Sequence, residues 1–199
     1  IVSEMPNMKY LQIFSHIITC LVEGEFMQME DVYRIDQGIE RYMTKTQKKT
    51  ADFMEGCMEL GGLLGGWSES EIVELKKYGH ALGMAFQITD DIMDYRETTE
   101  TTGKPVGNDL REGLLTYPLL SIVNDDNKDK LLADIKALNN GGDEQTIIDY
   151  VISQGGIDNT LAVADQYCKD ALAALDAVRD FPGKEFLVMA VENLADRKV

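Results

Sequence analysis

Apolar residues recur along this sequence at helical spacings, and that period constrains the fold more than any other feature. One apolar stripe follows Pro6 and consists of Leu11, Phe14, Ile18, Leu21 and Val22. Further helices are expected over 38–64 and 68–95, then shorter ones over 112–124, 128–139, 143–154, 157–179 and 184–197. Because no alternating strand pattern persists, the sequence predicts an all-α chain with its long helices first.

Helix breakers and caps mark where these helices end. A break is expected near Glu30 and Asp31, and Gly65-Gly66-Trp67 ends the second run. Ser68 with Glu71 has the form of a capping box, so a third helix begins there. Residues 98–109 form a loop rich in glycine, threonine and proline. Residues 1–199 therefore fit a single domain, or part of a larger one.

The charge balance excludes several partners. Lys plus Arg is 19 and Asp plus Glu is 35, so the formal net charge is 19 − 35 = −16. Such a surface repels nucleic acid and anionic lipid. The apolar stretch over 17–22 is too short to span a bilayer, and no signal peptide precedes it. An anionic substrate would need a local cluster of metal or lysine.

Three cysteines lie far apart in the sequence, at Cys20, Cys57 and Cys168. Their odd number, the absence of a CxxC pair and their apolar helical context favour reduced core cysteines over disulfides or zinc. This usage is typical of a cytoplasmic protein.

Three aspartates crowd the C-terminal end of the third helix, in Phe86-Gln87-Ile88-Thr89-Asp90-Asp91-Ile92-Met93-Asp94. Like charges and the helix dipole both oppose this placement, which indicates a compensating cation. The stripe of Phe86, Asp90 and Asp94 is predicted to face inward, with Gln87 and Asp91 on the adjacent stripe. Carboxylates converging from one helix suit Mg²⁺. The alternative is a solvated acidic helix end.

Possible counter-charge comes from Lys45, Lys48 and Lys49, three lysines within five residues of an otherwise acidic chain. A lysine followed by a hydroxyl residue can hold a phosphate. Lys49 borders the apolar run and is the better candidate, whereas Lys45 and Lys48 are expected on an outer helix face. Lys104, in the loop after the acidic helix, could close over a bound anion; a plain surface lysine is the alternative.

Taken in order, these segments resemble the trans-type polyprenyl diphosphate synthase family. The matching motifs are Lys49-Thr50-Ala51, Phe86-Gln87-Ile88-x-Asp90-Asp91-Ile92-x-Asp94, Gly103-Lys104-Pro105-x-Gly107-x-Asp109-Leu110 and Gly113-x-x-Thr116-Tyr117-Pro118-Leu119-Leu120. Upstream, Gly24-Glu25-x-x-Gln28 is similar to that family's preceding helix. The clear motifs cover residues 24–120, and their combination is far more specific than any one of them.

The resemblance implies a helical bundle of the isoprenoid synthase type and a Mg²⁺-dependent prenyltransferase. Such enzymes ionise an allylic diphosphate, and the cation alkylates isopentenyl diphosphate. Carried over by position, Asp90 should bind Mg²⁺, with Asp91 and Asp94 as direct or water-mediated ligands. Lys49, Thr50, Gln87 and Lys104 should hold the diphosphate or orient the aspartates. A homodimer is expected from the family.

The sequence also departs from that family. An earlier DDxxD and a basic GGKxxRP segment are absent, and Leu114 stands where many members have lysine. The acidic run Asp125-Asp126-Asn127-Lys128-Asp129 is no substitute, since it lies in a polar loop. We therefore expect the C-terminal portion of a synthase, inactive by itself. The alternatives are a terpene cyclase-like enzyme and a non-catalytic helical partner subunit.

Overall fold

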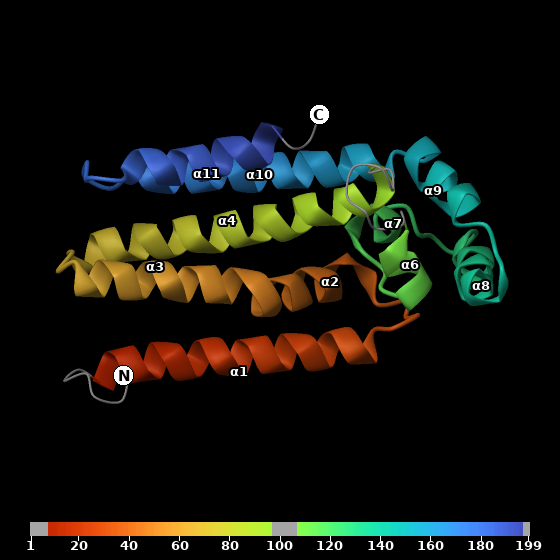
Figure 1. Ribbon diagram of the computed structural model, residues 1–199, viewed down its shortest axis with the longest axis horizontal. Coiled ribbons are helices and arrows are strands. Elements are labelled where there is room, and N and C mark those ends of the chain that lie inside the picture. Colours follow the sequence, from red (N-terminus) through yellow and green to blue (C-terminus); the bar gives the residue numbers. More distant parts are fainter. Residues whose placement is uncertain (1–7, 97–106, 197–199) are drawn as a thin grey trace.

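The computed structural model describes residues 8–96 and 107–196 and contains no strand within those ranges. Long helices lie side by side along the molecule, and short helices gather at one end (Figure 1). The helices are α1 Met8–Glu30, α2 Gly38–Thr46, the π-helical turn η2 Gln47–Ala51, α3 Asp52–Leu64, α4 Glu69–Arg96, α6 Asn108–Glu112, α7 Tyr117–Leu120, α8 Lys128–Ala137, the 3₁₀ turn η3 Leu138–Asn140, α9 Glu144–Ser153, α10 Gly156–Asp176 and α11 Lys184–Asp196.

The all-α prediction and most of the expected boundaries are confirmed. The backbone amide of Ser68 donates to Glu71 Oε2 at 3.1 Å and the amide of Glu71 donates to Ser68 Oγ at 3.4 Å, which is the predicted capping box. The expected helix over 112–124 is wrong. Gly113 adopts φ 75°, which ends α6, and the chain runs on without helix to α7.

Helix α4 is the central element, in contact with α3 and η2 on one side and with α10 and α11 on another. Most of its length is buried, from Ile72 to Tyr95. The backbone of α4 approaches η2 so closely at Gly83 that an added Cβ would lie 2.6 Å from Ala51 Cα. Only glycine fits there, and this contact fixes the distance between the two walls of the site described below.

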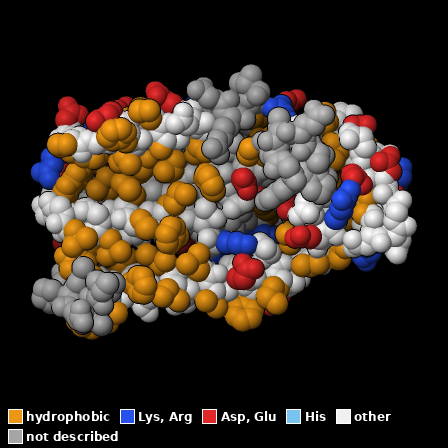
Figure 2. Space-filling model, viewed as in Figure 1, with side chains coloured by type: hydrophobic (Ala, Val, Ile, Leu, Met, Phe, Trp, Pro, Cys, Tyr) orange, Lys and Arg blue, Asp and Glu red, His pale blue; other side chains and the backbone are white. Residues whose placement is uncertain are grey.

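Helix α1 buries only one of its apolar stripes. Ile13, Ile17 and Cys20 face η2 and α3, whereas the large apolar residues of the other stripe stay exposed: Met8, Leu11, Phe14, Ile18, Val22, Phe26 and Met29. Figure 2 shows hydrophobic side chains gathered over the end of the molecule where α1, α3, α4 and α11 lie side by side. The stripe recognised in the sequence is therefore the exposed one.

The cysteine prediction holds in part. All three cysteines are free, and Cys20 and Cys168 are buried, but Cys57 is exposed on α3, so the prediction that it is a core residue is wrong. None of the described helices is long and apolar enough to cross a bilayer.

Candidate diphosphate and metal site

A cleft of about 180 Å³ lies between η2, the C-terminal half of α4 and the segment that precedes α7. Its lining combines carboxylates, lysines and amides from segments far apart in the sequence: Gln28, Tyr42, Lys45, Thr46, Lys49, Gln87, Asp90, Asp91, Asp109, Leu114, Leu115 and Thr116. Five polar residues that the sequence analysis considered for the site therefore meet in one place: Lys45, Lys49, Gln87, Asp90 and Asp91.

Asp91 is the buried centre of this cleft, with 4% of its surface exposed. Its carboxylate accepts hydrogen bonds from Tyr42 Oη at 2.5 Å, Gln87 Nε2 at 3.2 Å and the backbone amide of Tyr117 at 3.4 Å. Burial raises the pKa of Asp91 to about 7, although these donors oppose the shift. Asp91 is thus held rigidly, and its negative charge is costly unless a cation lies near.

Asp90 differs from its neighbour because it is exposed to the cleft. Phe86, one turn earlier on the same stripe, is 38% exposed. The prediction that the Phe86–Asp90 stripe faces the interior is therefore wrong, and the buried stripe is that of Gln87 and Asp91. The cause is the packing of η2, which meets α4 along the Gln87 side.

Asp94 completes the triad from the last turn of α4. Its two carboxylate oxygens accept the backbone amides of Asn108 at 3.0 Å and Asp109 at 3.2 Å. Burial raises the pKa of Asp94, while these amides lower it. Asp94 therefore caps the start of α6 and brings that helix, with the Asp109 carboxylate, against the cleft.

Asp109 also lines the cleft, although the sequence predicted no role for it. Burial, followed by repulsion from Asp94, Glu112 and Asp90, raises its pKa to about 6. Its place within the Gly103–Leu110 motif was the available signal. Crowded carboxylates with raised pKa values are what a divalent cation would relieve.

The opposite wall carries the Lys49-Thr50 pair on η2. Lys49 Nζ donates to Gln28 Oε1 at 2.7 Å and lies 3.0 Å from Glu25 Oε2, and Lys49 lines the cleft. Thr50 Oγ1 donates to Gln87 Oε1 at 3.1 Å, and Gln87 in turn donates to Asp91. The two walls are thereby joined by a Thr50–Gln87–Asp91 hydrogen-bond chain.

Lys45 was expected on an outer helix face, and that expectation is wrong. Its residue is 8% exposed, and its Nζ donates to Gln37 Oε1 at 3.4 Å and lies 3.8 Å from Asp31 Oδ2. Burial lowers the pKa of Lys45, and Asp31 and Asp91 raise it. Lys45 therefore adds a second cation to the cleft, one turn before Lys49.

The remaining lysine predictions have different outcomes. Lys48 points away from the cleft and pairs with Glu23 Oε2 at 2.6 Å, as expected for an outer face. Lys104 lies outside the described residues, so its predicted role stays a prediction.

The segment that carries Lys48, Lys49 and Thr50 is a π-helical turn, Gln47–Ala51. A π-helical turn holds one more residue than an α-helical turn and recurs at functional sites. Within it, Lys48 pairs with Glu23, Lys49 lines the cleft and Thr50 bonds to Gln87 on α4. The sequence predicted one helix over 38–64, and the apolar spacing within it gives no signal for this turn.

The residues present fit a hard divalent cation, with one restriction. Oxygen ligands from aspartates in a polar cleft suit Mg²⁺. Within the described ranges, however, the carboxylates of Asp90, Asp91 and Asp94 do not form a group whose ligand atoms all lie within 4.8 Å of one another. Asp90, the exposed member, is the best placed for direct ligation, while Asp91 and Asp94 are occupied by protein donors.

Comparison with known proteins shows the family of the chain. The profile of the Polyprenyl synthetase family matches residues 1–154. The chain belongs to this family. Heptaprenyl diphosphate synthase component 2 of Geobacillus stearothermophilus is 32% identical over 176 residues, which cover 88% of this chain and 55% of that protein. Octaprenyl diphosphate synthase of Escherichia coli K12 is 31% identical over 189 residues, covering 94% and 58%.

Solved structures give the same family and fold. The crystal structure of heptaprenyl diphosphate synthase from Staphylococcus aureus matches with a TM-score of 0.86 at 27% identity, over 98% of this chain and 62% of that one. Polyprenyl synthase from Caulobacter crescentus CB15, complexed with calcium and isoprenyl diphosphate, matches with 0.82 at 29%, over 97% and 60%. The resemblance seen in the sequence is confirmed, and this polyprenyl synthetase chain spans little more than half the length of these relatives.

Proposed function

We propose that this chain supplies one side of the active site of a prenyltransferase, an enzyme that joins an allylic diphosphate to isopentenyl diphosphate. The observation that carries the proposal is the cleft in which Lys45 and Lys49 face the aspartates of α4. The lysines would hold a diphosphate, and the carboxylates would hold its counter-cation. The lysines and the cation together would overcome the repulsion between a diphosphate and a chain with a net charge of −16. The relatives are named as polyprenyl diphosphate synthases, which supports the same reaction class here.

In the proposed reaction, the carbon–oxygen bond of the allylic diphosphate breaks and the diphosphate leaves with the electron pair. The double bond of isopentenyl diphosphate then attacks the allylic cation, and a proton passes to the departed diphosphate. Mg²⁺, bound through Asp90, would neutralise charge on the leaving group. Lys49, Thr50 and Gln87 would position that group, and Asp91 would fix the orientation of Gln87.

Ligand-induced stabilisation tests the metal and diphosphate site. Mg²⁺ with inorganic diphosphate should raise the melting temperature of the protein, and Asp90→Ala should remove the rise. Asp180→Ala is the matched control, because Asp180 is fully exposed and forms only a surface ion pair with Lys184. An unchanged response in Asp90→Ala would place the binding site elsewhere.

A lysine pair tests the opposite wall. Lys49→Ala should weaken the binding of Mg²⁺–diphosphate by about tenfold or more, the equivalent of roughly 1.4 kcal/mol. Lys48→Ala, one residue away on the same turn but paired with Glu23, should leave the affinity unchanged. Equal losses in the two variants would show that the lysines act only through net charge.

Three further features of the synthase remain proposals. We propose that this chain of 199 residues does not turn over allylic and isopentenyl diphosphate by itself, and turnover by the purified chain would contradict this. A homodimer is supported by the exposed apolar stripe of α1, and sedimentation should show the dimer in wild type and a monomer in Ile18→Glu. A cytoplasmic location is supported by three free cysteines.

A further inference from the structure

The two histidines of the sequence are His16 on α1 and His80 on α4, and neither lines the diphosphate cleft. His16 and Cys20 come from α1, and Asp52 begins α3. Their ligand atoms all lie within 4.8 Å of one another. Imidazole nitrogen, thiolate sulfur and carboxylate oxygen are the ligands that zinc takes in proteins.

We propose that His16, Cys20 and Asp52 form a binding site for a Zn²⁺-like divalent cation that joins α1 to α3. His16 and Cys20 are four residues apart, so they share one face of the helix. Cys20 Sγ lies 3.6 Å from His16 Nε2. A tetrahedral zinc with ordinary bond lengths separates sulfur and nitrogen ligands by about 3.5 Å, so this pair already has the spacing the ion needs.

Asp52 is held in place for the third position. Gln47 Nε2 donates to Asp52 Oδ1 at 3.2 Å, which orients the carboxylate beside the Cys20 thiol. Asp52 is 9% exposed, and Cys20 is 3% exposed. Two ligands with almost no access to solvent and one exposed histidine give a site that an ion can enter from the surface.

The charges around the cluster permit a cation. Burial, together with a hydrogen bond to Asp52, raises the pKa of the Cys20 thiol to about 11, so cation binding would release the thiol proton. Lys48 is the cation that opposes this effect, and its charge is offset by Glu23 at 2.6 Å. His16 and Asp52 also line a cavity of about 260 Å³ that leaves room for a water as fourth ligand. The charged residues of that cavity are Glu55 and Glu59 with Lys9 and Lys76, and the two lysines pair with these glutamates.

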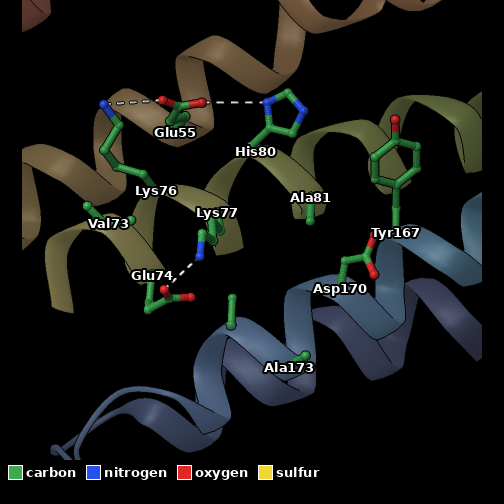
Figure 3. A pocket seen from close by; sticks show the side chains of 11 residues that line it. Glu55, Val73, Glu74, Lys76, Lys77, His80, Ala81, Tyr167, Asp170 and Ala173 are labelled. Atoms are coloured by element: carbon green, nitrogen blue, oxygen red, sulfur yellow. Dashed lines mark hydrogen bonds and ion pairs between the residues drawn. The ribbon is translucent and has the colours of Figure 1, made fainter. Parts of the chain in front are cut away.

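A second grouping shares Asp52 with Glu55 and His80, and it is the weaker candidate. Glu55 lies between a lysine and a histidine, because Lys76 Nζ is 3.3 Å from Oε1 and His80 Nδ1 is 3.5 Å from Oε2 (Figure 3). Lys76 already compensates its charge, and the grouping has no sulfur ligand. We therefore assign the ion to the first cluster, with Glu55 as a nearby negative charge.

Cobalt titration tests the assignment, because Co²⁺ substitutes for Zn²⁺ and reports a thiolate ligand as a charge-transfer band. Wild type should show this band, and Zn²⁺ should displace it. Cys20→Ser should abolish the band, and His16→Ala and Asp52→Asn should weaken Co²⁺ binding by at least about tenfold. Cys57→Ser, the exposed cysteine on the same helix as Asp52, is the matched control and should retain the band.

Several outcomes would overturn the assignment. A band lost in Cys57→Ser but kept in Cys20→Ser places the ion on the exposed thiol. Loss in His80→Ala with no change in His16→Ala places it on the second grouping. Absence of any band in wild type removes the site altogether. His16 is exposed, so His16→Ala should fold normally, and Asp90→Ala should bind Co²⁺ through the thiol like wild type, which separates this site from the diphosphate cleft.

Discussion

The aspartate cleft and the His16–Cys20–Asp52 cluster hold their acidic groups in opposite ways. In the cleft, Asp91 and Asp94 accept hydrogen bonds from protein donors, and only Asp90 stands open. In the cluster, the ligand atoms of the three side chains lie within 4.8 Å of one another, and Asp52 accepts a hydrogen bond from the Gln47 side chain. The cleft is therefore held by several protein donors on two of its aspartates, whereas the cluster is held mainly by the proximity of its own side chains.

The two sites also differ in the ligand atoms that they offer, and so in the ligands that they suit. The cleft offers oxygen and amine groups, which suit a hard cation carried with a phosphate. The cluster offers nitrogen, sulfur and one carboxylate, which suit a softer ion bound by itself. The π-helical turn lies between them, because it ends at Ala51, with Thr50 on the cleft side and Asp52 on the cluster side.

The largest expected effect comes from the backbone contact that supports both places. Gly83→Ala would put a Cβ 2.6 Å from Ala51 Cα, and we expect the free energy of unfolding to fall by about 3 kcal/mol. Gly61→Ala is the matched control, since an added Cβ there meets nothing within 4 Å. That variant should gain about 0.5–1 kcal/mol from helix propensity. Urea unfolding of the pair measures both, and equal changes would contradict the close packing of α4 on η2.

Next in size is the separate response to two ligands. Mg²⁺ with diphosphate, and Zn²⁺ alone, should each stabilise the protein by about 2.7 kcal/mol at a free concentration one hundred times the dissociation constant. Asp90→Ala should lose only the first response and Cys20→Ser only the second. Thermal melts of both variants with both ligands decide the matter. If one variant lost both responses, the two places would be a single site.

A smaller effect on stability is expected from the raised pKa of the buried Asp91. The folded pKa of Asp91, about 7, lies above its usual value of 3.8. The stabilisation that this shift implies is complete below the usual value and is lost as the pH rises through the folded value. Asp91→Asn cannot ionise. Without divalent cations, its free energy of unfolding relative to that of wild type should therefore rise by about 2 kcal/mol from about pH 5 to about pH 8.

Urea unfolding at the two pH values measures this gain. Asp180→Asn is the control, because its side chain is fully exposed. The same stability difference between Asp91→Asn and wild type at both pH values would show that the Asp91 carboxyl is not desolvated in the folded protein.

The smallest effect is expected far from both places. Ser68→Ala removes the hydroxyl that accepts the amide of Glu71 at the start of α4. It should cost about 1 kcal/mol of stability and leave the binding of both ligands unchanged. A loss of ligand affinity in this variant would show that the two ends of α4 are coupled.

The sequence predicted the elements better than their faces. Helical periodicity and breakers located α1, α3 and α4 because those signals are local. Which stripe is buried depends on the partner helix, so the Phe86–Asp90 stripe was assigned to the wrong side. The helix expected over 112–124 failed at Gly113, whose positive φ allows the segment that follows to line the cleft.

The site residues that lie within sequence motifs could be predicted, whereas those brought to the site by helix packing could not. Lys49, Gln87 and Asp91 meet as expected, and their hydrogen bonds were only implied. Lys45 is buried by the turn after α1, which contributes Asp31 and Gln37. The cluster of Cys20 with Asp52 brings together residues 32 apart in the sequence. No local sequence pattern predicts this contact, since it depends on how α1 packs against η2.

The single extra residue in the π-helical turn also makes this segment unusually sensitive to length. In an α-helix each residue advances the helix by about 100°. The extra residue is accommodated within Gln47–Ala51, so deleting Gln47 would return the segment to regular α-helix while α2 and α3 keep their mutual register. Only the residues inside the turn would rotate, so the deletion should move Lys49 and Thr50 relative to α4 and weaken Mg²⁺–diphosphate binding more than it lowers the free energy of unfolding.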